Sequence, residues 1–176
     1  MKFAELELEV LVQRASVLLA RSRTRVVFAE SCTAGLVAAS LAVVAGISQY
    51  LCGSAVTYRD ATKSGWLDIP QPILDRWTAV SEQVADLMAR GVLARTPEAD
   101  VAVAVTGHLG PDAPPDQDGL LLIGLALREQ SPSGIISRPA TRHRLAPTGR
   151  SARQREAARL VLLRLCSELE SKPTLS

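Results

Sequence analysis

Aromatic residues are scarce in this 176-residue chain, which has two each of Trp, Tyr and Phe. Six rings are too few for the stacking platforms that bind single-stranded nucleic acid. A net charge of +2 is also too small to attract nucleic acid by itself, so we expect no nucleic-acid partner. Because 47% of the residues are nevertheless hydrophobic, the sequence predicts a packed core built from alanine, valine, leucine and isoleucine.

Cysteine and histidine are also rare, which excludes two kinds of site. Cys32, Cys52 and Cys166 are odd in number and show no CxxC spacing, so neither a disulfide framework nor a zinc site is predicted. His108 and His143 occur without an HExxH or similar motif. We expect no metal, no other cofactor and no histidine-dependent catalytic triad.

Long hydrophobic runs are missing as well. Residues 35–47 form one of the longest, but Ser40 and Gly46 interrupt it and it is shorter than the roughly 20 residues of a membrane span. The first ten residues, MKFAELELEV, carry acids where a signal peptide has a basic start and an unbroken apolar stretch. The sequence predicts a soluble cytoplasmic protein without a membrane partner.

Hydrophobic periodicity predicts helices and strands that alternate along most of the chain. Expected helices cover residues 3–22, 31–44, 61–67, 73–77, 81–95 and 148–170. Expected strands cover 25–30, 50–57, 101–105, 120–127 and 135–145, the last two joined by a turn at 131–134. This order predicts an α/β fold in which residues 1–176 form a single three-layer α/β/α domain with a mixed, mostly parallel sheet.

The first candidate site is the segment Glu-Ser-Cys-Thr-Ala-Gly at 30–35, between the first strand and the next helix. Unpaired backbone N–H groups at such a helix start suit a phosphate or a developing oxyanion. Ser31 could act there as a nucleophile. The alternative is that Ser31 or Thr33 merely caps the helix.

The second candidate is Tyr58-Arg59-Asp60-Ala61-Thr62-Lys63, just after the second strand. A serine nucleophile needs a base, and a lysine can serve where burial or nearby cations lower its pKa. Tyr58 could relay the proton or orient that base. Lys63 is the one lysine away from the chain ends, although it could equally be an ordinary exposed helix residue.

The third candidate is Thr106 and Gly107, with Gly110 shortly after, directly behind the apolar strand 101–105. Ligands collect at the C-terminal ends of parallel strands, where Ser31 and Tyr58 would also lie. A plain surface turn is the alternative interpretation.

Arginines are dense near the end of the chain: eight lie between 138 and 164, with Glu156 as the single acid. Arg150 and Arg153 are candidates for binding a ligand anion. The alternative is a solvated helix face with salt bridges between subunits.

The chain has no GxxxxGK[ST] and no GxSxG, and Ala34 stands where an SxxK motif starting at Ser31 needs lysine. The H-x-E and P-C-x-x-C signatures of zinc deaminases are also absent.

Together these motifs resemble the CinA C-terminal domain family. The resemblance covers roughly residues 10–165 and is carried by AESCTAG at 29–35, GSAVTYRDATK at 53–63, AVSEQVADLMARGV at 79–92, AVTGHLGP at 104–111 and RxxR at 150–153. Stand-alone members of this family include nicotinamide-nucleotide amidohydrolases, which convert nicotinamide mononucleotide (NMN) to nicotinate mononucleotide and ammonia in pyridine-nucleotide recycling.

The resemblance implies a CinA C-terminal-like fold, an NMN substrate, no cofactor and a homo-oligomer of two or more copies. It also implies that Ser31 is the catalytic nucleophile, with Lys63 and Tyr58 as base and proton relay. The substrate-binding residues are then expected to be Glu30, Cys32, Thr33, Gly35, Thr106, Gly107, Gly110, Arg150 and Arg153.

The chain departs from the family pattern around the third candidate. Ala34 replaces the first glycine of the usual CTGG, and His108, Leu109, Asp112 and Ala113 alter the usual TGIAGPGG. The usual KPVGTV-like segment reads QDGLLL at 117–122. Two alternatives therefore stand beside NMN hydrolysis: a divergent amidase acting on another carboxamide, and a non-catalytic nucleotide-binding module.

Overall fold

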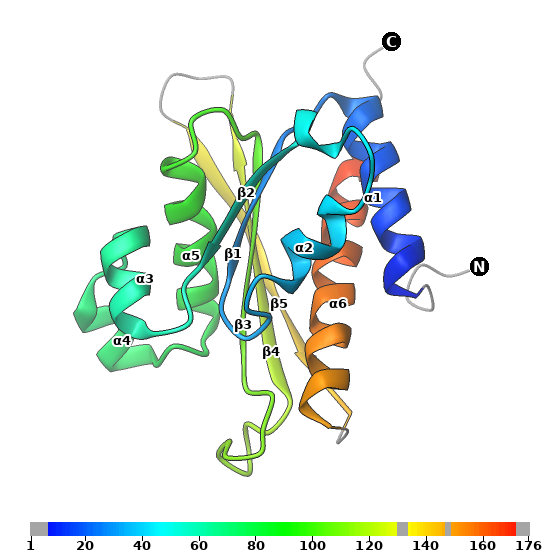
Figure 1. Ribbon diagram of the computed structural model, residues 1–176. Helices are drawn as coiled ribbons and strands as arrows, with labels where there is room; N and C mark the ends of the chain where they lie inside the picture. Colours follow the sequence, from blue (N-terminus) through cyan, green and yellow to red (C-terminus); the bar gives the residue numbers. More distant parts are fainter. Residues whose placement is uncertain (1–6, 130–133, 147–148, 172–176) are drawn as a thin grey trace.

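The computed structural model describes residues 7–129, 134–146 and 149–171, which form a five-stranded sheet between two layers of helices (Figure 1). The three-layer α/β/α architecture predicted from the sequence is thereby confirmed. Parts of three predicted elements, at 3–6, 131–133 and 148, lie outside the described residues.

The sheet has the strand order β2-β1-β3-β4-β5. Its first three strands in that order, β2, β1 and β3, pair in parallel, whereas β3–β4 and β4–β5 are antiparallel. Only β4 therefore runs against the other four strands, and the mixed sheet is the predicted one. The strands are β1 (Val26–Glu30), β2 (Leu51–Val56), β3 (Val101–Gly107), β4 (Leu120–Arg128) and β5 (Ile135–Arg144).

Helices cover both faces of the sheet. On one face lie α1 (Leu8–Ser22), α2 (Leu36–Ala42) and α6 (Arg150–Ser171), and on the other lie α3 (Asp60–Leu67), α4 (Gln71–Trp77) and α5 (Glu82–Ala94) (Figure 1). A short 3-10 helix, η2 (Ile47–Gln49), leads into β2 and was not predicted. Among the described residues, no helix combines the length and apolar character needed to cross a bilayer.

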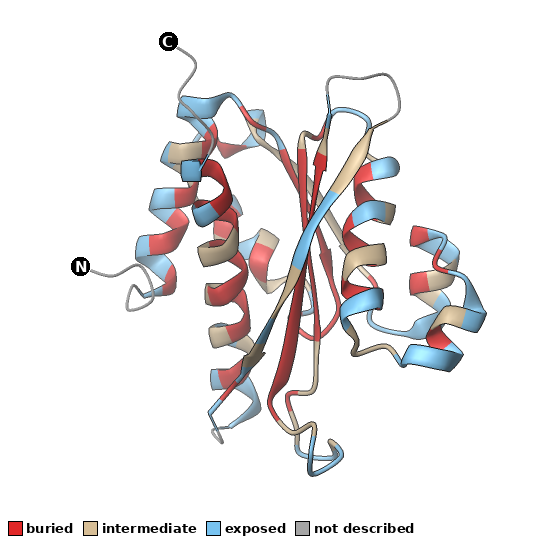
Figure 2. Ribbon diagram, turned by 180° about the vertical axis from the view of Figure 1, so that it is seen from behind, coloured by how far each residue is buried: buried red, intermediate tan, exposed pale blue. Residues whose placement is uncertain are grey.

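The core is almost entirely aliphatic, as the composition predicts, and the central strands are buried while β5 is partly exposed (Figure 2). Gly124 in β4 shows how tightly α5 packs on the sheet. A Cβ atom there would lie 2.2 Å from the Ala85 carbonyl oxygen of α5, closer than any real contact. Only glycine allows the helix backbone to approach the strand so closely.

Candidate active site

Three strand ends meet at one edge of the sheet and enclose a cavity of about 310 Å³. Ser31 follows β1, Tyr58 follows β2, and Thr106 and Gly107 end β3. Because these three strands are parallel, their carboxyl ends share an edge, which is where open α/β sheets bind ligands. The predicted site residues that line the cavity are Ser31, Cys32, Tyr58, Lys63, Thr106, Gly107, Gly110 and Arg150.

Lys63 reaches the cavity from α3 and is only 1% exposed. The alternative of an ordinary exposed lysine is therefore wrong. Burial lowers the pKa of the Lys63 ammonium, while the Asp60 carboxylate, 3.4 Å from Nζ, opposes this by favouring the charged form. A buried lysine with a lowered pKa has the property required of a general base.

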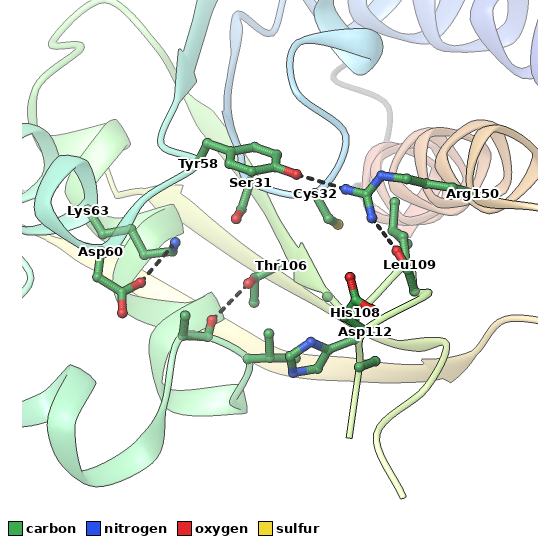
Figure 3. Close-up of a pocket in the computed structure, with 15 residues that line it drawn as sticks. Ser31, Cys32, Tyr58, Asp60, Lys63, Thr106, His108, Leu109, Asp112 and Arg150 are labelled. Atoms are coloured by element: carbon green, nitrogen blue, oxygen red, sulfur yellow. Dashed lines mark hydrogen bonds and ion pairs between the residues drawn. The ribbon is translucent and has the colours of Figure 1, made fainter. Parts of the chain in front are cut away.

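Ser31 is 8% exposed and lies immediately beyond β1. Its backbone N–H donates to the Val105 carbonyl (3.0 Å), which continues the β1–β3 pairing and fixes the position of Ser31. The Ser31 hydroxyl donates to no other described residue. In Figure 3 it points into the region of the cavity that also contains the Lys63 amine. The hydroxyl is thus free to meet a ligand.

Glu30 lies outside the cavity, in contrast to the expectation that it binds substrate. It is 1% exposed, and its carboxylate accepts hydrogen bonds from the backbone N–H groups of Gly35, Val37 and Ala38 at the start of α2. The helix therefore begins at Leu36 and not at residue 31, because a carboxylate from the preceding strand caps it. Because Glu30 occupies these three N–H groups, they do not provide the anion site predicted for the segment 30–35.

Thr33, Gly35 and Arg153 also lie outside the cavity. The Thr33 hydroxyl donates to Glu30 (2.8 Å), so neither it nor Ser31 caps α2. The Arg153 guanidinium makes two 2.6 Å bonds to the Asp118 carboxylate. All three residues hold the protein framework around the site and do not line the cavity.

Tyr58 contacts Arg150 and not Lys63. Its hydroxyl accepts a hydrogen bond from the Arg150 guanidinium at 2.7 Å, and the same guanidinium donates to the Gly110 carbonyl (Figure 3). Arg150 thereby links the end of β2 to the loop after β3 across the cavity mouth. Because Tyr58 is 53% exposed, it lies at that mouth, and its hydroxyl is turned away from the buried amine.

Thr106, Gly107 and Cys32 line the cavity, and the first two also hold neighbouring parts of the fold together. The Thr106 hydroxyl donates to the Ala79 carbonyl (2.8 Å), tying β3 to the segment before α5. A Cβ atom on Gly107 would lie 2.7 Å from the Leu120 carbonyl, so glycine is needed for close pairing with β4. Burial raises the pKa of the Cys32 thiol to about 12, which keeps it protonated.

Several residues that line the cavity were not selected from the sequence. Asp60 was missed although it stands three residues before Lys63, a spacing that places both on one face of a helix. His108 and Asp112 were noted only as departures from the family pattern, and they also line the cavity. Leu109 and Ala113, noted in the same way, also line the cavity, and Ala79 and Val80, for which the sequence carries no signal, complete the lining.

The other arginines of the C-terminal region mostly form contacts within the chain. Arg138 pairs with the buried Glu168, and Arg144 donates to two carbonyls of the loop before β4. Both arginines of β5 therefore have partners within the chain, and the predicted salt bridges between subunits remain a prediction. Within the described ranges, no group of three or more His, Cys, Asp or Glu residues is arranged to hold a metal ion.

Comparison with known proteins identifies the family. The sequence model of the CinA C-terminal domain matches residues 8–167. A putative competence-damage inducible protein of Symbiobacterium thermophilum is 42% identical over 130 residues, 73% of this chain and 30% of that protein. One of Desulforudis audaxviator is 47% identical over 95 residues, 54% of this chain and 23% of that protein. The chain thus spans less than a third of these relatives.

Solved structures agree with the sequence matches. The competence damage-inducible protein A (ComA) of Klebsiella pneumoniae superposes with a TM-score of 0.84 at 29% identity, covering 96% of this chain and all of that one. The competence/damage inducible protein CihA of Agrobacterium tumefaciens superposes with a TM-score of 0.81 at 30% identity, covering 93% and 96%. Since the family model spans nearly the whole described chain, the protein belongs to the CinA C-terminal domain family.

Proposed function

We propose that this protein is an amidohydrolase that converts NMN to nicotinate mononucleotide and ammonia, with Ser31 as nucleophile and Lys63 as general base. The observation that carries the proposal is the placement of both side chains in one cavity, where burial lowers the pKa of Lys63. A neutral amine is what a serine hydroxyl needs in order to lose its proton at moderate pH. The family resemblance supplies the choice of substrate.

The first chemical step forms a tetrahedral intermediate. Lys63 accepts the Ser31 proton while the hydroxyl oxygen attacks the carboxamide carbon. The N–H groups of Cys32 and Thr33, which donate to no oxygen of the described residues, are available to stabilise the oxyanion. They take the role first expected of the α2 start.

Breakdown of this intermediate forms the Ser31 ester, and hydrolysis of the ester then releases the acid. The protonated Lys63 returns its proton to the leaving nitrogen, the C–N bond breaks and ammonia departs. Water then attacks the Ser31 ester, again with Lys63 as base, and restores the free hydroxyl. Tyr58 and Arg150 act at the mouth, where the guanidinium provides positive charge suited to the substrate phosphate.

Substrate identity is tested by measuring ammonia release from NMN beside nicotinamide, nicotinamide riboside and glutamine. The proposal predicts the highest kcat/KM for NMN. A higher value for another carboxamide would favour a divergent amidase, for which the altered residues His108 and Asp112 at the cavity are the supporting observation. Binding of NMN without ammonia release would instead indicate a nucleotide-binding module.

The pH profile tests the role of Lys63. Only its neutral form accepts a proton, so kcat should rise as pH increases through its pKa. The Asp60 charge holds this pKa up, and Asp60→Asn is therefore expected to move the acidic limb of the kcat profile to lower pH. Asp75→Asn, on the exposed face of α4, serves as the control and should leave the limb in place. A limb that stays fixed, or moves to higher pH, in Asp60→Asn would contradict this role.

The proposal includes a cytoplasmic location and a homo-oligomer, which both remain predictions. Exposed valines on α1, Val10 and Val17, provide apolar surface consistent with a subunit contact.

A further inference from the structure

A second hollow, of about 730 Å³, lies at the opposite end of the strands from the candidate active site. It is placed at the amino ends of β1 and β2, next to the end of α1 and to η2. These elements lie together in Figure 1, at the end of the sheet away from α3. Ligands of open α/β sheets usually bind at the carboxyl ends, so the active-site architecture does not account for this hollow.

Two arginines line the hollow, and neither has an acidic partner among the described residues. Arg23 ends α1 in the left-handed conformation (φ 49°), and Arg25 precedes β1. The Arg25 backbone N–H, not its guanidinium, binds the Asp100 carboxylate (2.7 Å). Six other arginines of the described residues form an ion pair with a carboxylate, whereas the side chains of Arg23 and Arg25 are exposed.

A β-bulge shapes the wall of the hollow. Val26 pairs with Leu51 but Val27 pairs with Gly53, so Cys52 is an extra residue in β2. Bulges are rare between parallel strands and redirect side chains at sheet edges. Cys52 lines the hollow, and burial raises the pKa of its thiol.

The remaining wall is polar and has one aromatic ring. Gln49 ends η2, Tyr50 precedes β2, and Glu98 lines the hollow from the loop before β3. Arginine guanidinium groups bind phosphate in a bidentate manner, and a carboxylate accepts hydrogen bonds from sugar hydroxyls. A simple anion would use only the arginines, whereas a ligand that also carries hydroxyl groups would use Glu98 as well.

We propose that this hollow is a second binding site, for a small phosphate ester that carries hydroxyl groups. Arg23 and Arg25 hold the phosphate, and Glu98 accepts the hydroxyl groups. This inference does not depend on the proposed catalytic function, since it uses no residue of the active-site cavity.

Ribose 5-phosphate is the probe, and backbone amide NMR shifts of the full chain report both location and affinity. We expect shift changes concentrated at residues 48–52. Arg25→Gln and Arg23→Gln should each weaken binding about tenfold, the effect of losing one charge-assisted contact. Arg21→Gln, an exposed arginine of α1 that does not line the hollow, is the matched control and should bind as the wild type does.

A second variant tests the choice of ligand. Glu98→Gln should lower the affinity for ribose 5-phosphate but not for inorganic phosphate. An unchanged preference between these two ligands would overturn the assigned hydroxyl recognition. Absence of binding at millimolar ribose 5-phosphate, shift changes confined to the surroundings of Ser31 and Arg150, or undiminished binding by the Arg23→Gln/Arg25→Gln double variant would overturn the site itself.

Discussion

Lys63→Met is expected to abolish turnover and, at neutral pH, to make the protein more stable. Turnover is lost because methionine cannot accept the Ser31 proton. Stability rises because a buried ammonium is costly and Asp60, half exposed at 3.4 Å, compensates for it only in part. Replacing such a group by an apolar side chain of similar length contributes about 1 kcal/mol to the free energy of unfolding.

The free energy of unfolding should depend on pH because of Lys63. The folded state releases the Lys63 proton at lower pH than the unfolded state does, because burial lowers its pKa from 10.5. The free energy of unfolding of the wild type should therefore increase as the pH rises from the folded-state pKa to the unfolded-state pKa of Lys63. Lys63→Met should not show this increase. Thermal unfolding at several pH values measures it.

Lys63→Arg is the matched control, since arginine retains the buried charge but cannot act as a base. It should be inactive and less stable than the wild type. Activity in Lys63→Met, or a lower melting temperature than that of the wild type at pH 7, would contradict the role and the environment assigned to Lys63.

Glu30→Gln is expected to cause a large loss of stability. The Glu30 carboxylate accepts five hydrogen bonds: three from the α2 start, one from Thr33 and one from Ser54. An amide would turn a donor toward some of these donors and leave them unsatisfied in the interior. We expect a cost of about 3–5 kcal/mol in the free energy of unfolding, typical of breaking a buried charged network.

Chemical denaturation measures this cost. Glu98→Gln, an exposed carboxylate on the loop before β3, serves as the control and should change the free energy of unfolding by less than about 0.5 kcal/mol. A loss below about 1 kcal/mol in Glu30→Gln would show that the carboxylate does not secure the start of α2.

Much of the fold could be predicted from the sequence because the local patterns agree with the tertiary structure. The apolar run 101–105 predicts a central strand, and β3 is indeed buried along nearly its whole length. The helix predicted from residue 31 was wrong at its start because of the local backbone conformation. Ala34 (φ 53°) and Gly35 (φ 96°) adopt the left-handed conformation, which a right-handed helix excludes, and the Glu30 carboxylate caps the helix that starts at Leu36.

The sequence predicts the site residues that lie at the ends of strands. It does not predict contacts between residues that are far apart in the sequence. Ser31, Tyr58 and Thr106 come together because β1, β2 and β3 are parallel. The pairing of Tyr58 with Arg150 joins residues 92 positions apart, and no local pattern indicates it. For the same reason Tyr58 was expected beside the catalytic base, whereas its hydroxyl contacts the cavity mouth.

The most direct test of Ser31 as nucleophile is ammonia release from NMN by the wild type and by Ser31→Ala. We predict turnover by the wild type and a loss of at least about 10³-fold in kcat for the variant, as for other serine nucleophiles. Ser167→Ala, an exposed serine of α6 far along the chain from the site, is the control and should retain wild-type kcat. Equal ammonia release by Ser31→Ala and the wild type would contradict the proposed nucleophile, and no release by the folded wild type would contradict the proposed reaction.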